Sequence, residues 1–284
     1  MSRFQAEQLL LGCTAEGAVL LAQSAPRKTP AVHLRASVRA EPRADRPLAA
    51  LCRALHDLAP EPPAATPAGA AGLAVTLDDG LVRSFIVTPP RGAQGLRELR
   101  ASAAARFSAL YGESAEHWLL AADWQAAAPF IACALPRELH QQLEQLARTQ
   151  GWHLKSVRPA LVRVWNHVCA ALPADGWLVV GFGNTLTLVY TRQGESAGVR
   201  TLRLSGTPSL AELATLLEQE RLRNPEDSQT RARQSLLWAG GADWLPAAAT
   251  IAGFASRTLP LSRQTATAAG WPAAEQLALA GSEH

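Results

Sequence analysis

The pattern of apolar and polar residues predicts strands most clearly between residues 177 and 204, WLVVGFGNTLTLVYTRQGESAGVRTLRL. The first segment of this stretch is almost wholly apolar. In the second segment, Thr185, Thr187 and Val189 alternate with Leu186, Leu188 and Tyr190. Both patterns are typical of strands in a largely buried sheet. Asn184 and the pair Gln193-Gly194 lie where the chain must reverse direction. A helical pattern starts near Pro208. We therefore predict a β-β-β-α unit.

A weaker copy of this pattern opens the chain. Residues 8–23 read as two strands, residues 31–38 alternate as a third, and residues 47–58 carry leucines at helical spacing. Pro47 suits the first turn of that helix. The order is again β-β-β-α, so the sequence predicts a duplicated architecture.

The same periodicities, together with turn residues, predict the other elements. Strands are expected at residues 73–77, 81–88, 117–124, 130–135, 234–239 and 257–261. Helices are expected at residues 95–110, 137–149, 159–172, 244–254 and 272–279. In the helix near Pro208, Ser209 and Glu212 have the spacing of a capping box.

These elements indicate an α/β protein of two related domains, at residues 1–172 and 173–284. A small α+β unit at about 81–155 is expected as an insertion in the first domain. The last elements of the chain can return to the first domain.

Composition narrows the class of protein. The chain has 284 residues, of which 48% are hydrophobic and 18% charged, which is typical of a globular protein. A net charge of +3 is too small to favour nucleic acid as a partner. The longest uncharged apolar stretches reach ~10 residues, about half of what a membrane-spanning helix needs. The segment LLGC at residues 10–13 resembles a lipoprotein cleavage box, but Glu7 interrupts the apolar run that such a signal requires.

The cysteines and histidines do not suggest a metal site. The four cysteines are separated by 39, 81 and 36 residues, so no CxxC pair indicates zinc or a redox dithiol. They are expected to be buried apolar side chains in a reducing compartment. The seven histidines form neither an HxxxH nor an HExxH motif.

Several conspicuous features are better explained by structure than by chemistry. GFGNT at 181–185 lacks the third glycine of a dinucleotide-binding fingerprint and precedes a strand, so we interpret it as a tight hairpin. Asp78-Asp79-Gly80 is interpreted as a turn and not as an acid/base pair. Most of the eight tryptophans are expected in the core. The arginine-rich region 27–53 is interpreted as a solvated face, with attraction to an anionic membrane as the alternative.

Two β-β-β-α units with a small insertion in the first resemble the actin-like (ASKHA) fold. Within that fold, the chain resembles the actin-like assembly proteins of type IV pili (PilM-like) and the related cytoplasmic domain of the type II secretion protein GspL. Four stretches carry the resemblance: VVGFGNTLTLVYTRQGESAGVRTLRL at the second phosphate loop, LAVTLDDGLVRSFIVTPP at the entry to the inserted unit, Arg137–Val157 at its exit, and SLLWAGG at the adenosine-side glycines.

The resemblance also implies a nucleotide cleft, from which this sequence departs. In nucleotide-hydrolysing relatives, an aspartate at the end of the first strand of each phosphate loop holds the metal. No aspartate stands at the corresponding places near Leu10 and Gly181, and Glu16 is the only carboxylate in either loop. Mg²⁺ needs oxygen ligands of this kind, so hydrolysis is expected to be lost or very weak. We assign no catalytic residue, no metal and no cofactor, with ATP left open as a ligand. The expected vestigial nucleotide site is Gly181, Gly183, Asn184, Thr185, Gly240 and Gly241.

By resemblance, we expect a non-enzymatic cytoplasmic scaffold in the assembly of a type IV pilus or a type II secretion-like inner-membrane platform. Relatives dock the short cytoplasmic tail of an inner-membrane protein in a groove beside the inserted unit. The chain ends at His284 without a membrane span, so we expect the free cytoplasmic form, peripheral at the inner membrane through its partner. A homodimer is left open. The alternatives are an ATP-binding ATPase or kinase of the same superfamily with an altered metal site, and a binding module of unrelated α/β fold.

Overall fold

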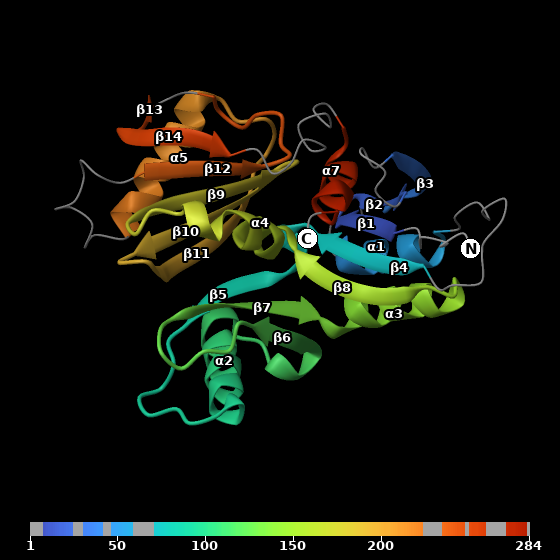
Figure 1. Ribbon diagram of the computed structural model, residues 1–284, viewed down its shortest axis with the longest axis horizontal. Coiled ribbons are helices and arrows are strands. Elements are labelled where there is room, and N and C mark those ends of the chain that lie inside the picture. Colours follow the sequence, from blue (N-terminus) through green and yellow to red (C-terminus); the bar gives the residue numbers. More distant parts are fainter. Residues whose placement is uncertain are drawn as a thin grey trace, which may run out of the picture.

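The strands of the protein form three sheets (Figure 1). A computed structural model describes residues 8–24, 31–41, 47–58, 71–223, 235–247, 250–259 and 271–282. Two of the sheets build the two halves of the molecule, and the third lies beside both of them.

The first sheet belongs to the N-terminal half. Its strands are β1 (Gln8–Thr14), β2 (Gly17–Gln23), β3 (Val32–Arg39), β4 (Gly72–Leu77) and β8 (His153–Pro159). Their order is β3-β2-β1-β4-β8. β2 is antiparallel to both of its neighbours, whereas β4 is parallel to β1 and to β8.

The second sheet repeats this topology. Its strands are β9 (Gly176–Phe182), β10 (Thr185–Arg192), β11 (Glu195–Arg203), β12 (Ser235–Gly240), β13 (Thr250–Ile251) and β14 (Phe254–Leu259). Their order is β11-β10-β9-β12-β14-β13, with β10 antiparallel to both neighbours and β12 parallel to β9 and β14. The shared order and directions confirm the prediction of two related β-β-β-α units.

Helices cover both faces of the first sheet. α1 (Pro47–His56) and α3 (Arg137–Thr149) lie on one face, where Leu11, Leu55 and Leu143 pack in one core. α7 (Ala273–Ala280) lies on the other face and packs against Leu10. The C-terminal helix therefore lies on the N-terminal sheet.

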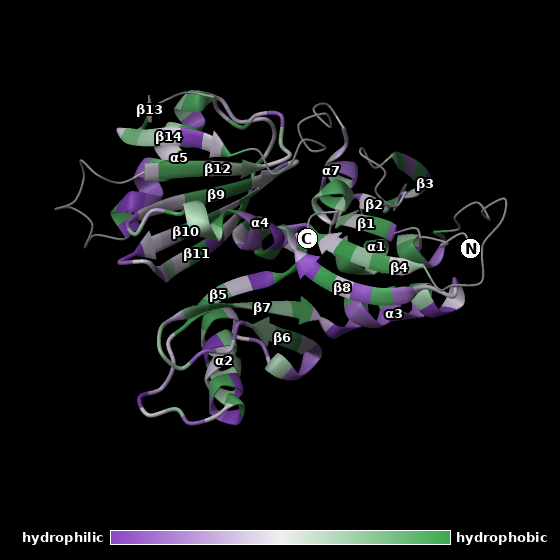
Figure 2. Ribbon diagram, in the orientation of Figure 1, coloured by the Kyte–Doolittle hydropathy of each residue, from purple (hydrophilic) through white to green (hydrophobic). Residues whose placement is uncertain are grey.

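The second sheet is covered in the same way. α5 (Leu210–Arg223) packs on the face that carries Trp177 and Trp238, while α4 (Ala160–Val168) packs on the opposite face together with Leu277 of α7. Because both faces are covered, β9 is buried along its whole length, as its nearly continuous apolar sequence predicts. Figure 2 shows hydrophobic residues concentrated in these central strands and hydrophilic residues along α3 and α5.

The predicted capping box at the start of α5 is confirmed. The Ser209 hydroxyl accepts from the Glu212 amide at 3.2 Å, and the Glu212 carboxylate accepts from the Ser209 amide at 2.7 Å. Two backbone donors that the helix leaves without an internal partner are thereby satisfied.

The inserted unit is a three-stranded sheet covered by one helix. It consists of β5 (Arg83–Val87), α2 (Leu96–Tyr111), β6 (Trp118–Ala122) and β7 (Phe130–Pro136), in the strand order β5-β7-β6. Phe85, Phe107 and Phe130 form its own core. Since α3 and β8 pack with the first sheet, we propose that the insertion ends at β7, earlier than the limit of about 155 expected from the sequence.

Three expectations from the sequence were wrong or incomplete. The described residues of this range, 244–247 and 250–254, do not form the expected helix of 244–254: a turn, β13 and the start of β14 lie there, because Pro246 and the positive φ of Gly253 interrupt helical geometry. β8 was not predicted, since polar residues obscure its alternation. Cys169 is exposed, whereas the other three cysteines are buried as expected.

Candidate functional site

The structure brings the predicted glycine positions together at the carboxyl ends of β9 and β12. Gly181 and Gly240 are register partners in the parallel pair. The amide of Gly241 donates to the carbonyl of Gly181 at 3.0 Å, so this amide is used inside the protein. Gly183 and Asn184 form the turn from β9 to β10, and Gly183 has a φ of 51°, which favours glycine.

The chain's own residues fill the space beside these glycines. A Cβ atom added to Gly12, at the first loop, would lie 1.8 Å from the carbonyl oxygen of Ala274 in α7. A Cβ atom added to Gly181 would lie 2.8 Å from the ring of Trp244. The distance at Gly12 is far shorter than any real contact and involves backbone atoms, so glycine is required for the close approach of α7. The distance at Gly181 is also shorter than real Cβ contacts, so a larger residue there would have to displace the ring of Trp244.

Trp244 and α7 also hold the second loop. The indole nitrogen of Trp244 donates to the carbonyl oxygen of Gly183 at 2.6 Å. Gly183 also lies close to α7: a Cβ atom added to it would lie 2.7 Å from the Cβ of Ala273, in the first turn of that helix. The observed role of these glycines is to admit protein atoms, and their role in holding a nucleotide stays a prediction.

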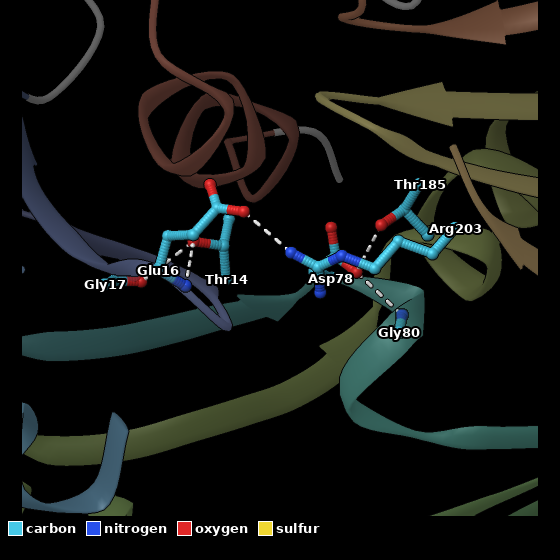
Figure 3. Close-up of polar contacts among 7 residues, drawn as sticks. All are labelled: Thr14, Glu16, Gly17, Asp78, Gly80, Thr185 and Arg203. Carbon is cyan, nitrogen blue, oxygen red and sulfur yellow. Dashed lines mark hydrogen bonds and ion pairs between the residues drawn. The ribbon is translucent and has the colours of Figure 1, made fainter. Parts of the chain in front are cut away.

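Asp78 joins the end of β4 to the second half. It caps the short turn Asp79–Leu81, where its Oδ1 atom accepts from the Gly80 amide at 2.7 Å, which confirms the predicted turn. The same oxygen accepts from the Thr185 hydroxyl of β10 at 2.9 Å (Figure 3). A residue of the first half is thereby bonded to Thr185, which the sequence places in the expected nucleotide site.

Asp79 makes a second connection of this kind. Its two carboxylate oxygens accept from the Leu161 amide at 2.9 and 3.1 Å, and Oδ2 also accepts from the Thr187 hydroxyl at 2.9 Å. Leu161 lies in the first turn of α4, where the N-cap residue Pro159 offers no side-chain hydrogen bond. Asp79 therefore supplies, from a distant segment, the cap that α4 lacks.

Burial controls the protonation of both carboxyl groups. Asp78 is 5% exposed and Asp79 is 3% exposed. Burial raises the pKa of Asp79 to about 7, opposed by the hydrogen bond from Leu161 and reinforced by the charge of Asp78. Burial also raises the pKa of Asp78, against the hydrogen bonds from Gly80 and Thr185. Asp79 therefore changes its charge near neutral pH.

An ion pair lies at the edge of the contact that Asp78 and Asp79 make between the two halves, which we call the junction. Arg203 of β11 contacts Glu16, in the turn between β1 and β2, at 2.6 Å (Figure 3). The Glu16 amide donates to the Thr14 hydroxyl at 3.2 Å, which orders this turn. The side chains of Glu16 and Arg203 are 70% and 54% exposed, so the pair contributes little to stability, about 0–1 kcal/mol.

Metal binding has no support at this junction. Across the described ranges, no group of three or more His, Cys, Asp and Glu side chains is placed to hold a metal ion. The oxygens of Asp78 and Asp79 that make contacts accept from protein donors, and Glu16 pairs with Arg203.

The sequence did not reveal that the two aspartates connect the halves. Their local pattern, two acids and a glycine after an apolar strand, predicts only the turn. Thr185 and Thr187, their partners, alternate on a strand more than a hundred residues later. One feature of the sequence could have indicated this connection: two adjacent acids stand at the carboxyl end of a buried parallel strand, β4.

A groove of about 700 Å³ lies between the inserted unit and the first half. Its walls include β6 and β8, which within the described residues are edge strands of their sheets. Edge strands present backbone groups that can pair with another chain. The largest apolar residues of the lining are Leu77, Leu119, Leu135, Trp152 and Leu154, and its ionisable residues other than cysteine are His140, Glu144, Arg148, His153 and Lys155.

The groove continues toward α4. A second cavity of about 550 Å³ shares Ala121, Cys133, Val157 and Pro159 with the first and extends to Trp165. The combined surface offers both apolar contacts and strand edges, which suits an extended peptide better than a compact small molecule.

The fold defines the class of protein: it is the actin-like fold, with two halves of the same topology and an inserted unit in the first. No model of a known protein family matches the sequence. No curated protein matches it significantly. In the parts of the chain that are described, no helix has both the length and the apolar character needed to cross a bilayer.

Three solved structures share this fold. The chain is similar to one in the PilM-PilN type IV pilus biogenesis complex, with 16% identity, a TM-score of 0.56, and coverage of 98% of this chain and 99% of that chain. It is also similar to the cytoplasmic domain of EpsL, an inner-membrane component of the type II secretion system of Vibrio cholerae, with 14% identity, a TM-score of 0.54, and coverage of 98% and 94%. A third similar structure is a Bacteroides thetaiotaomicron protein of actin-like ATPase fold and unknown function, with 7% identity, a TM-score of 0.50, and coverage of 84% and 85%.

Proposed function

We propose that this protein is a non-enzymatic scaffold that docks the cytoplasmic tail of a membrane partner in a type IV pilus or type II secretion-like assembly. In this role it works in the cytoplasm and reaches the inner membrane through that partner. The similarity to the PilM-PilN complex and to EpsL over almost the whole chain supports the proposal.

The groove between β6 and β8 is the observation that carries the proposal. An extended tail can pair with a strand edge through its backbone while alternate side chains enter apolar pockets. Leu119 of β6 and Leu154 of β8 both line the groove and provide such apolar contacts. We assign the docking site to this groove.

The packing at the phosphate loops supports a role without catalysis. α7 and Trp244 lie against Gly12 and Gly181, and neither loop has an aspartate to hold Mg²⁺. Phosphoryl transfer depends on metal-assisted positioning and charge stabilisation, which these loops lack the side chains to provide.

A matched pair of substitutions tests the docking site. Ala121 is exposed on β6 and lines the groove, so Ala121→Trp should block it. Ala105 is exposed on α2, and Ala105→Trp adds the same bulk outside the groove wall. We expect wild type and Ala105→Trp to capture one single-span inner-membrane protein from solubilised membranes of the native host. A synthetic peptide of its cytoplasmic tail should bind both proteins in calorimetry, and Ala121→Trp should weaken binding at least about tenfold.

Two results would contradict the proposal. One is equal binding of the tail peptide by Ala121→Trp and Ala105→Trp, provided that both melt at the wild-type temperature. The other is capture through the transmembrane or periplasmic part of the partner, with no affinity for the tail peptide.

A further inference from the structure

We propose that Asp78 and Asp79 form a latch between the two halves of the molecule, and that this latch weakens as pH rises toward neutrality. The aspartate latch comprises these two residues, the Thr185 and Thr187 hydroxyls and the Leu161 amide. It is a property of the isolated protein and does not depend on the proposed docking function.

Geometry is the first support for the latch. Both aspartates follow β4 of the first half. Their donors Thr185 and Thr187 lie in β10 of the second half, and Leu161 lies in α4, which packs on the second sheet. The bonds are 2.9 to 3.1 Å long and nearly excluded from water. Separation of the halves at this point must therefore break all of these bonds together and admit water to both carboxyl groups.

Charged groups reach the latch from several elements. A cavity of about 370 Å³ beside Asp79 is lined by Arg83 of β5, Tyr111 of α2, and Arg200 and Arg203 of β11. Arg83 is paired with Glu113, and Arg200 with Glu220. From α4 and β10, the groups that bond to the two aspartates are the uncharged donors named above.

Glu16, in the turn between β1 and β2, is paired with Arg203 of β11. Arg203 lowers the pKa of Asp78 and Glu16 raises it, so the two charges oppose each other. β7 contributes Cys133, whose thiol has a pKa raised to about 11 by burial and stays uncharged at neutral pH. Burial raises the pKa of both carboxyl groups, and that of Asp79 to about 7.

The sign of the pH effect follows from proton linkage. In the closed junction the pKa of Asp79 is about 7, against an ordinary value of 3.8 once water reaches it. Between these values the closed form binds a proton that the open form releases, so closure is strongest at low pH. The open fraction should rise by up to about tenfold per pH unit across this interval and level off above about pH 7.

Hydrogen exchange at the Leu161 amide reads this opening directly, because that amide is bonded to Asp79. We expect its protection, corrected for the intrinsic effect of pH on exchange, to fall between pH 5 and pH 7 in the wild type. Asp79→Asn keeps an oxygen for Leu161 and cannot ionise, so protection should fall clearly less with pH than in the wild type, with Asp78, whose pKa is also raised, as the remaining titrating group of the latch. Asp175→Asn is the control, since Asp175 also accepts from a backbone amide, that of Gln193, but within the second half.

Three results would overturn the latch: a flat profile in the wild type, an unchanged slope in Asp79→Asn, or loss of the slope in Asp175→Asn. If Asp79→Asn does not fold, the variant Thr187→Val tests the latch in its place. It removes a hydrogen bond that lowers the pKa of Asp79, so the fall in protection should extend to higher pH. A Thr187→Val profile that coincides with the wild type would likewise overturn the proposal.

Discussion

At the residue scale, the glycines of the two loops show how one sequence feature can serve two purposes. From the sequence, GFGNT indicates a tight hairpin, and the resemblance to the actin-like fold implies that its glycines and the diglycine at 240–241 bring backbone close to a nucleotide. In the structure, α7 and Trp244 make the close approach. Local pattern cannot distinguish the two cases, because Gly12 and its contact Ala274 lie near opposite ends of the chain.

Gly12 gives the sharpest test of this packing. In Gly12→Ala the new methyl group would lie 1.8 Å from the Ala274 carbonyl oxygen and 2.6 Å from the Ala278 nitrogen. Since these are backbone atoms of a helix that is buried in the core, they cannot move aside without shifting α7. We expect a loss of about 3 kcal/mol or more in the free energy of unfolding, measured by urea denaturation.

Gly206→Ala is the matched control, because a Cβ atom there meets nothing within 4 Å. It should change the free energy of unfolding by no more than about 0.5 kcal/mol. Equal stability of Gly12→Ala and Gly206→Ala would mean that α7 does not approach the first loop as closely as described.

At the element scale, the sequence predicted the strands and helices whose periodicity coincides with burial. β9 and β10 were clear because apolar residues run through them and both faces of their sheet are covered. β8 was hidden because it is a partly exposed edge strand in which Lys155, Ser156 and Arg158 break the alternation of apolar and polar residues. The alanines and the leucine of segment 244–254 favour a helix, whereas the pairing of β13 with β14 is a tertiary contact that propensity does not predict.

The start of α5 offers a test of a local prediction. In Ser209→Ala the Glu212 amide loses its acceptor, and the helix loses one side of the capping box. We expect a loss of about 1 kcal/mol in the free energy of unfolding. Ser209→Asp should restore most of the lost stability, because aspartate also caps helices well. Ser205→Ala is the control: Ser205 is exposed and lies before the helix, so its loss should have almost no effect on stability. A Ser209→Ala protein as stable as Ser205→Ala would show that the box does not hold this helix.

At the scale of the whole molecule, the duplicated topology was predictable while the junction between the halves was not. Each β-β-β-α unit is a local pattern that repeats along the chain. The junction depends on contacts between segments that are far apart: Asp78 with Thr185, Glu16 with Arg203, and α7 with both loops. Each contact is a pairing of ordinary residues, so none has a sequence signature of its own.

The composition of this junction leads to a prediction about ATP and Mg²⁺. An actin-like enzyme needs a carboxylate that is free to hold the metal beside the phosphates. Here Asp78 and Asp79 accept from donors of the second half, and Glu16 is paired with Arg203. We therefore expect that Mg²⁺ changes the affinity for ATP less than about twofold in calorimetry, a difference of about 0.4 kcal/mol. Phosphate release should not exceed that of a protein-free blank.

The variant Glu16→Gln tests whether Glu16 holds a metal, because it removes the charge of the most exposed of the three carboxylates and keeps the volume of the side chain. If the wild type has no metal site, the variant should behave like the wild type with and without Mg²⁺. If ATP binding or turnover depends on Mg²⁺ in the wild type and this dependence is lost in Glu16→Gln, then Glu16 leaves Arg203 to hold the metal. The protein would then be an actin-like enzyme whose metal ligand has moved from the strand end into the turn.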